Sequence, residues 1–331
     1  MSDKPKFIKV PIFSAVLFLV LFTAAIGYSA YSLITNQSAT QASTTSSTKV
    51  TFAPAKKDKA ELQFYVMSFC PYGNQAEDII KPVHDLLGAK ADIRPQYIFD
   101  KIPNLVEYCK SRTGDIAQCA KYVEGGYFKD EKECVAQVTA DNKECNNEKN
   151  FIKAQNGAFY GSLHGRVEAN QDVREICAYN QAANKNDWWA FIDNVNKNCT
   201  SQNADTCWEE QAKKANLDTA KITQCFNTEA IDLIEKELAL TNSNNIQGSP
   251  TLMVNGVAFP PENSYTQDGK GTVTIGKKII TQDKFRSPDA LKEAICAGFK
   301  KAPKECSTVL ADLVAAAGSQ PSADAAGCAT N

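Results

Sequence analysis

The sequence lacks any C-x-x-C pair, although it has 12 cysteines in 331 residues, and it has only two histidines, His84 and His164. Zinc sites built from cysteine knuckles need such closely spaced ligands, so we expect no zinc site. A basic surface is also lacking, because 36 Lys and Arg face 38 Asp and Glu and the net charge is −2. The sequence therefore gives no indication of nucleic-acid binding.

The N-terminal region predicts a single membrane anchor. Residues 1–9 carry Lys4, Lys6 and Lys9, and residues 10–34 form an uncharged, mostly apolar run about long enough to span a bilayer. The basic flank predicts a cytoplasmic N-terminus and an extracytoplasmic remainder. A cleaved signal peptide is the alternative and would make the protein secreted, but the length of the run favours an anchor. Residues 35–59 are rich in Ser, Thr, Ala and Lys and predict a flexible linker.

The most informative stretch is Glu61–Gly73, ELQFYVMSFCPYG. It reads as a buried strand that runs into Cys70-Pro71-Tyr72-Gly73 and then into a helix. Pro71 suits the first helical turn, where its missing N–H would be unpaired in any residue. Cys70 is then the N-cap, and the free N–H groups and the helix dipole there favour a thiolate. Gly73 stands where a C-x-x-C motif has its second cysteine, so this motif has one sulfur.

The hydrophobic pattern predicts an α/β fold over residues 60–309. A strand, a helix over 71–87 and a second strand over 91–99 form a β-α-β unit with parallel strands. Residues of about 103–245 carry eight cysteines and predict a helical insertion stapled by disulfides. The fold resumes with a strand over Thr251–Val254, an Asn255-Gly256 hairpin turn, a partner strand over 272–280 and a final helix over 288–299. Residues 310–331 predict a disordered tail.

A second motif, Ser249-Pro250, opens the strand after the insertion. X-Pro bonds are the peptide bonds that are held cis at modest cost. A cis-proline beside Cys70 would expose the Ser249 backbone to an extended substrate strand. The alternative is an ordinary proline at the start of a strand.

Together these two motifs resemble the thioredoxin superfamily, in particular its DsbA-like branch with a helical insertion. A narrower resemblance is to the gamma-interferon-inducible lysosomal thiol reductases, on His164-Gly165-Arg166-Val167-Glu168 leading to Cys177. This sequence has Ser162, Ala169 and Asp172 where that family has Cys, Cys and Asn. The resemblance covers about residues 60–306.

The resemblance implies particular site residues. Cys70 would be the attacking thiol and Pro250 the cis-proline, and the substrate would contact Pro71, Tyr72, Ser249, Pro250 and Thr251. The His164–Cys177 stretch would be structural, and we expect His164 and His84 to be histidines satisfied by local contacts. No dissociable cofactor is implied.

The function we predict is that of a membrane-anchored, extracytoplasmic thiol-disulfide oxidoreductase-like protein. Cys70 would form mixed disulfides with protein or peptide substrates. Because Gly73 cannot resolve them, an external thiol, a membrane redox partner or another cysteine of the chain must do so. Two alternatives stay open: a thioredoxin-fold binding or scaffold module without turnover, and a Cys70 held in a structural disulfide.

Cysteine counting favours a disulfide framework in an oxidising compartment. Removing Cys70 leaves eleven cysteines, and Cys328 in the tail is the natural second unpaired thiol. Short loops favour Cys296–Cys306 and Cys199–Cys207, followed by Cys134–Cys145 and Cys109–Cys119, and we also predict Cys177–Cys225. Resolution of Cys70 by Cys328 is a further hypothesis.

Overall fold

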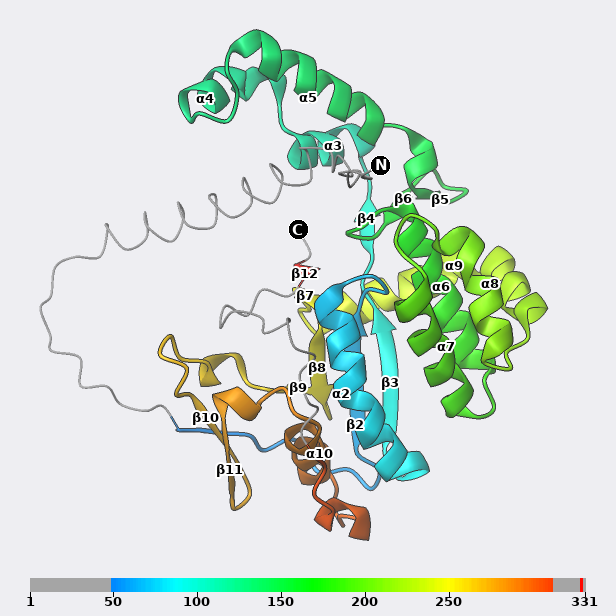
Figure 1. The fold of residues 1–331 in the computed structure, drawn as a ribbon, viewed down its shortest axis with the longest axis vertical. Helices are drawn as coiled ribbons and strands as arrows, with labels where there is room; N and C mark the ends of the chain where they lie inside the picture. Colours follow the sequence, from blue (N-terminus) through cyan, green and yellow to red (C-terminus); the bar gives the residue numbers. More distant parts are fainter. Residues whose placement is uncertain (1–48, 312–327, 330–331) are drawn as a thin grey trace, which may run out of the picture. The chain divides into compact units, whose positions relative to one another are not determined.

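The computed structural model describes residues 49–311 and 328–329 (Figure 1). The predicted anchor over 10–34 and most of the predicted tail lie outside these ranges. Within them, no helix combines the length and the apolar character that a membrane span requires.

The central sheet has the strand order β3-β2-β8-β9. Strand β2 (Glu61–Val66) leads through helix α2 (Pro71–Leu87) to β3 (Asp92–Tyr97), which pairs parallel to β2. Strand β8 (Thr251–Val254) pairs antiparallel on the other edge of β2 and continues into β9 (Val257–Ala258). The β-α-β unit and the strand after the insertion thus form as the sequence leads us to expect, and the structure adds the antiparallel pairing of that strand with β2.

The hairpin partner differs from the prediction. Asn255 and Gly256 both have positive φ, at 49° and 83°, which suits a two-residue turn and returns the chain at once into β9. The segment predicted as partner instead forms β10 (Thr272–Ile275) and β11 (Lys278–Thr281), which pair with each other. They belong to a separate sheet of order β1-β10-β11.

The predicted linker over 35–59 is wrong at its C-terminal end. Strand β1 (Lys49–Thr51) pairs parallel to β10, and the Phe52 ring packs edge-on against Phe259 with the ring centroids 5.1 Å apart. Phe52 is buried because it is a large apolar residue at the end of an otherwise polar run. The folded part of the chain therefore includes residues from 49 onward.

The insertion is mostly helical, as predicted. Outside residues 114–141 its helices are α3 (Leu105–Thr113), α6 (Arg166–Gln181), α7 (Lys185–Asn198), α8 (Ala204–Lys214) and α9 (Thr219–Ser243). It also contains a small sheet that the sequence did not indicate, formed by β4 (Asp100–Ile102), β5 (Ile152–Lys153) and β6 (Phe159–Gly161) in the order β4-β6-β5. These strands have only two or three residues, too few to show an alternating pattern.

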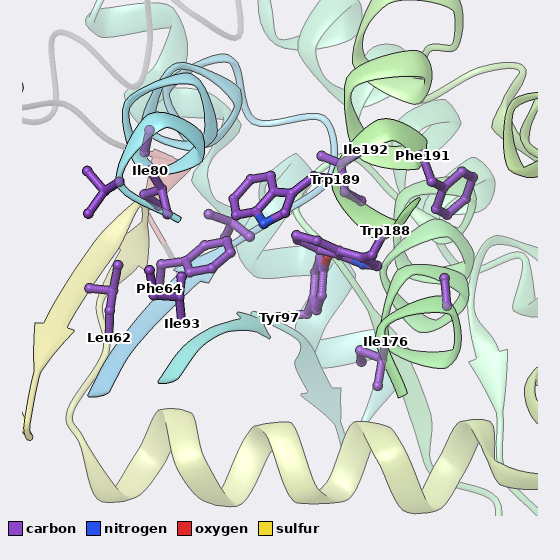
Figure 2. Packing of buried hydrophobic residues seen from close by; sticks show 14 of the residues in the cluster. Leu62, Phe64, Ile80, Ile93, Tyr97, Ile176, Trp188, Trp189, Phe191 and Ile192 are labelled. Atoms are coloured by element: carbon purple, nitrogen blue, oxygen red, sulfur yellow. The ribbon is translucent and has the colours of Figure 1, made fainter. Parts of the chain in front are cut away.

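Helix α7 provides the aromatic part of the main core. Trp188 and Trp189 extend from it toward Phe64 on β2 and Tyr97 on β3 (Figure 2). The Trp189 ring stacks on Phe64 with centroids 5.8 Å apart and planes 15° from parallel. Trp188 is fully buried, and its indole N–H donates to the Glu175 carbonyl at 3.0 Å. This aromatic contact fixes helix α7 against the central sheet.

Residues 114–141 form a compact unit of their own. It contains α4 (Cys119–Glu124) and most of α5 (Glu131–Cys145). Its small core is made of Cys119, Cys134 and Val138. The Cys119–Cys134 disulfide closes this core.

All 12 cysteines are paired in the structure. Cys296–Cys306, Cys199–Cys207 and Cys177–Cys225 are bonded, as the sequence led us to expect. The predicted Cys134–Cys145 and Cys109–Cys119 pairs are wrong, because the structure has the nested pairs Cys109–Cys145 and Cys119–Cys134. The physical reason is that α5 carries Cys134 and Cys145 on one continuous helix, eleven residues apart and too far for a bond.

The chain ends its main fold with α10 (Pro288–Ala297), which packs against α2. Short 3₁₀ helices occupy Gly88–Lys90, Ile116–Gln118, Glu148–Asn150, Glu262–Ser264, Gln282–Lys284 and Lys304–Ser307. Two further strands, β7 (Gly248–Ser249) and β12 (Cys328–Ala329), pair with each other and belong to the candidate site. Part of the tail that was predicted to be disordered is thus an ordered strand, because β7 offers it a backbone edge.

Candidate functional site

Cys70 is the N-cap of α2, with Pro71 in the first helical turn. Its backbone is extended, with φ −74° and ψ 115°, and its carbonyl accepts the first helical bond from Asn74 N at 3.0 Å. Both features follow locally from the Cys-Pro sequence. The Cys70 side chain is completely buried, at the positive end of the helix dipole.

Ser249 and Pro250 lie beside Cys70, and the bond between them is cis. The Cys70 Sγ atom is 3.5 Å from the Ser249 carbonyl oxygen. The Ser249 hydroxyl accepts from Met67 N at 3.2 Å, and Ser249 is fully buried. The two motifs that the sequence singled out are therefore in contact, although about 180 residues separate them.

Cys70 is bonded to Cys328. The S–S distance is 2.10 Å and the two Cα atoms are 6.1 Å apart. Cys328 belongs to β12, which pairs antiparallel to β7 so that Cys328 faces Ser249 and Ala329 faces Gly248. The strand, coloured red, lies beside β7 in Figure 1. The interpretation of Cys70 as a lone thiol, with Cys328 unpaired in a disordered tail, is corrected by this bond.

The other predicted contact residues lie around the same position. Tyr72 is partly buried against a small apolar cluster that contains Cys70 and is contacted by Cys328. Pro71 is exposed on the first turn of α2. Thr251 opens β8, and its hydroxyl donates to the Gly248 carbonyl at 2.8 Å. Pro71 and Tyr72 belong to α2, directly after Cys70, and Thr251 belongs to β8, directly after Pro250.

The loop that carries Cys70 is held by two acidic residues of α6. Asp172 Oδ1 accepts from the Ser68 backbone N–H at 2.9 Å and from the Ser68 hydroxyl at 2.6 Å. Glu168 Oε1 accepts from Phe69 N at 2.9 Å. Glu168 and Asp172 are fully buried and one helical turn apart. Sequence reasoning did not assign them this role; their spacing of four residues, which places both acids on one face of a helix, was the usable signal.

His164 also belongs to this arrangement, because it contacts Glu168. Its ring Nδ1 is 2.7 Å from Glu168 Oε1, and its backbone N–H donates to Glu168 Oε2 at 2.9 Å. The hydrogen bond to Glu168 raises the pKa of His164, whereas burial lowers the pKa of His84, whose ring packs near Trp189. His164 thus has a positioning role: it contacts Glu168, and Glu168 in turn holds the Cys70 loop.

More buried carboxyls lie next to this helix face. Burial is the main reason why the pKa of Asp172 lies well above its usual range, and repulsion from the nearby Glu168 raises this pKa further. Burial likewise raises the pKa of Glu175 to about 7, although Tyr97 OH donates to it at 2.8 Å. Glu237, which accepts from Tyr97 N at 2.8 Å, also has its pKa raised by burial to about 7. The protein therefore carries several protonatable acids on α6 and around Tyr97.

The strand order, the N-cap cysteine and the adjacent cis-proline define a thioredoxin-like fold. A sequence profile described as the vacuolar sorting receptor thioredoxin-like domain matches residues 107–262. This match spans slightly less than half of the chain and includes Ser249 and Pro250 but not Cys70.

Solved structures with similarity to this chain include two from Mycobacterium tuberculosis. Reduced DsbA is 15% identical with a TM-score of 0.38, over 79% of this chain and 93% of that chain. Reduced DsbG is 14% identical with a TM-score of 0.38, over 78% of this chain and 88% of that chain. A thioredoxin-like oxidoreductase from Silicibacter pomeroyi DSS-3 is 13% identical with a TM-score of 0.34, over 62% and 83%. Comparison with curated proteins gives no match.

Proposed function

We propose that the protein carries out thiol-disulfide exchange with protein or peptide substrates, and that Cys70 is the sulfur that forms the mixed disulfide. One observation supports this most directly. Cys70 starts α2 beside the Ser249 carbonyl, and its present bonding partner arrives on a strand that pairs with β7. A substrate cysteine on an extended segment would use the same backbone edge.

The chemistry needs a thiolate on Cys70. In the reduced protein, the N–H groups at the start of α2 and the helix dipole favour the charged sulfur over the thiol. That thiolate attacks a substrate disulfide, forms the Cys70–substrate bond and releases the second substrate sulfur as a thiolate. Pro71, Tyr72, Ser249, Pro250 and Thr251 would contact the substrate, and no dissociable cofactor takes part.

The cellular setting is part of the proposal. Six disulfides in one chain are typical of an oxidising compartment. Residues 10–34 would anchor the protein with the folded part outside the cytoplasm, where an external thiol or a membrane redox partner exchanges electrons with it. The contacts of His164 and Glu168 around the Cys70 loop support a branch related to the gamma-interferon-inducible thiol reductases.

The decisive experiment is alkylation of the mildly reduced protein across a range of pH. We expect Cys70 to react with a midpoint below about pH 8.5, the pKa of an ordinary thiol. Mass spectrometry of tryptic peptides identifies the modified cysteine, and Cys70→Ser is the control. A Cys70 that stays unmodified at neutral pH in folded, reduced protein would contradict the proposal.

A second candidate is a thioredoxin-fold binding or structural module without turnover. The observation in its favour is that Cys70 and Ser249 are both fully buried and that Cys70 is already bonded. In that case the Cys70–Cys328 bond would resist a glutathione buffer until the whole domain unfolds. Reduction of this bond well below the unfolding midpoint excludes the structural function.

A further inference from the structure

We infer that Cys328 is the second redox cysteine of this site and that strand β12 acts as an internal substrate. When the Cys70–Cys328 bond is closed, β12 occupies the backbone edge of β7, where an external substrate would pair. This inference rests on the proposed function and names what resolves the Cys70 adduct. It also names the substrate class, an extended cysteine-containing segment that pairs antiparallel to Gly248–Ser249.

The arrangement of the bond supports this inference. Four of the other five bridges join positions 8 to 36 residues apart, and the fifth spans 48, whereas the Cys70–Cys328 bond spans 258. It is also the bridge that includes the N-cap residue of α2. Cys328 contacts the buried cluster formed by Tyr65, Met67, Cys70, Ile98, Ile246 and Met253. A cysteine bound in this way completes the apolar surroundings of Cys70.

Strand β12 is held weakly by its backbone. Its ladder with β7 consists of two residue pairs, Cys328 with Ser249 and Ala329 with Gly248. A pairing this short contributes little stability by itself. Once the disulfide opens, a longer substrate segment can replace the strand. The same edge cannot hold both, so the redox state of the bond determines access to Ser249.

The exchange reaction needs no sulfur from the protein other than those of Cys70 and Cys328. In the oxidising direction a substrate thiolate attacks Cys70 Sγ, the Cys70–Cys328 bond breaks and Cys328 leaves as a thiolate. A second substrate thiolate then attacks the substrate sulfur of the mixed disulfide, and Cys70 leaves as a thiolate. The substrate has lost two electrons and gained a disulfide, and the protein has gained the two electrons on Cys70 and Cys328. The reverse sequence reduces a substrate disulfide.

Cys328 also supplies the resolution step that Gly73 cannot. Its thiolate attacks Cys70 Sγ in the mixed disulfide, reforms the Cys70–Cys328 bond and releases the substrate thiolate. A thiol carried on the same chain acts at an effective concentration on the order of millimolar. Adducts of the unaltered protein should therefore be short-lived without any added thiol.

The test compares the mildly reduced full-length protein, which retains its five other disulfides, with Cys328→Ser in the same state. The probe is the peptide DAAGCATN, the sequence of residues 324–331, carried as its disulfide with thionitrobenzoate. Attack by the Cys70 thiolate releases the coloured thionitrobenzoate and leaves the peptide on Cys70. We expect the adduct of Cys328→Ser to last at least tenfold longer than that of the unaltered protein. The double variant Cys199→Ser/Cys207→Ser is the matched control for loss of a disulfide and should match the unaltered protein.

A second probe tests the strand pairing. The peptide DAAPCPTN has proline on both sides of the cysteine and lacks the two N–H donors there. We expect Cys328→Ser to capture it at least fivefold more slowly than DAAGCATN. Equal capture rates would show that the strand edge at Ser249 does not select the probe.

The outcomes separate the inference from the proposed function. Equal adduct lifetimes in the unaltered protein and in Cys328→Ser overturn the inference while the function stands. No adduct on Cys70 in either folded, reduced protein overturns the function. If Cys328→Ser fails to fold, the unaltered protein is titrated in glutathione buffers and its alkylated peptides are mapped. The inference then requires Cys70 and Cys328 to become free together before the other ten cysteines, and it fails if they do not.

Discussion

A Cβ atom on Gly73 would lie 2.8 Å from the Ser249 hydroxyl oxygen. Gly73 is the third residue of α2, the position of the missing second cysteine, and the Ser249 hydroxyl is held by Met67 N. The same Cβ atom would lie 3.5 Å from Cys70 Cβ, within the range for a disulfide. A cysteine at 73 could therefore reach Cys70 only if Ser249 moved.

Gly73→Ala should destabilise the protein by about 1–3 kcal/mol, because the added methyl group overpacks a buried position. Without the close contact to the Ser249 hydroxyl oxygen, replacing this glycine by alanine would stabilise the helix by about 1 kcal/mol. Urea unfolding at neutral pH measures the effect. The double variant Gly73→Ala/Ser249→Ala should lose less stability than the sum of the two single variants, because it removes the close oxygen. Strict additivity in this cycle would contradict the contact.

Glu168→Ala should be among the most harmful substitutions near the site. It leaves Phe69 N, His164 N and the Ser162 hydroxyl without their buried acceptor. Each orphaned donor costs about 1–3 kcal/mol, so we expect a loss of at least about 3 kcal/mol. Chemical unfolding measures it, and Glu229→Ala, an exposed glutamate on α9, is the control and should change stability by less than about 0.5 kcal/mol. A small loss for Glu168→Ala would show that the Cys70 loop is held by other contacts.

Stability should fall as the pH rises from about 4.5 to 7. The pKa of buried Glu175 is raised from 4.5 to about 7, so its contribution is fully present below the unfolded pKa and is lost as the pH rises through the folded value. A shift of this size corresponds to at most about 3 kcal/mol. We expect Glu175→Gln to flatten the pH profile of the unfolding free energy over this window. Glu229→Gln is the matched control, and an unchanged slope in Glu175→Gln would disprove the assignment.

The two histidines should titrate on opposite sides of the ordinary value of 6.5. The hydrogen bond to Glu168 raises the pKa of His164, and burial lowers the pKa of His84. Because the chain has only two imidazoles, proton NMR resolves both curves directly. His84→Gln assigns the signals, and Glu168→Gln should lower the pKa of His164 while leaving that of His84 in place. Coincident curves at 6.5 would be inconsistent with the Glu168 contact.

The parts of the fold that depend on local chemistry could be predicted from the sequence. The Cys70-Pro71 pair determines the start of α2, and the apolar run before it forms β2. Asn255-Gly256 determines the turn after β8. Each of these features depends on residues that are neighbours along the chain, so its physical cause is visible in the sequence.

Features that depend on distant partners could not be predicted in this way. The entropy cost of closing a loop rises slowly with loop length, so the Cys109–Cys145 bond costs only about 1 kcal/mol more than a bond that closes a ten-residue loop. Packing outweighs a difference of this size, and loop length therefore did not identify the correct cysteine pairs. Glu168 and Asp172 were visible as a pair one turn apart, but only the folded chain brings Ser68 and Phe69 to them. Cys328 has no neighbouring residue that points to Cys70.

The Cys70–Cys328 bond also makes the oxidised chain a closed covalent ring of residues 70–328. A protease that cuts once anywhere inside this ring produces no separate fragments while the bond is intact. Reduction of that bond, with the other bridges retained, converts the same cut into two pieces wherever no other disulfide spans it. If free thiols are blocked before denaturation, fragment release on a denaturing, non-reducing gel therefore measures whether the site was open or closed when the thiols were blocked.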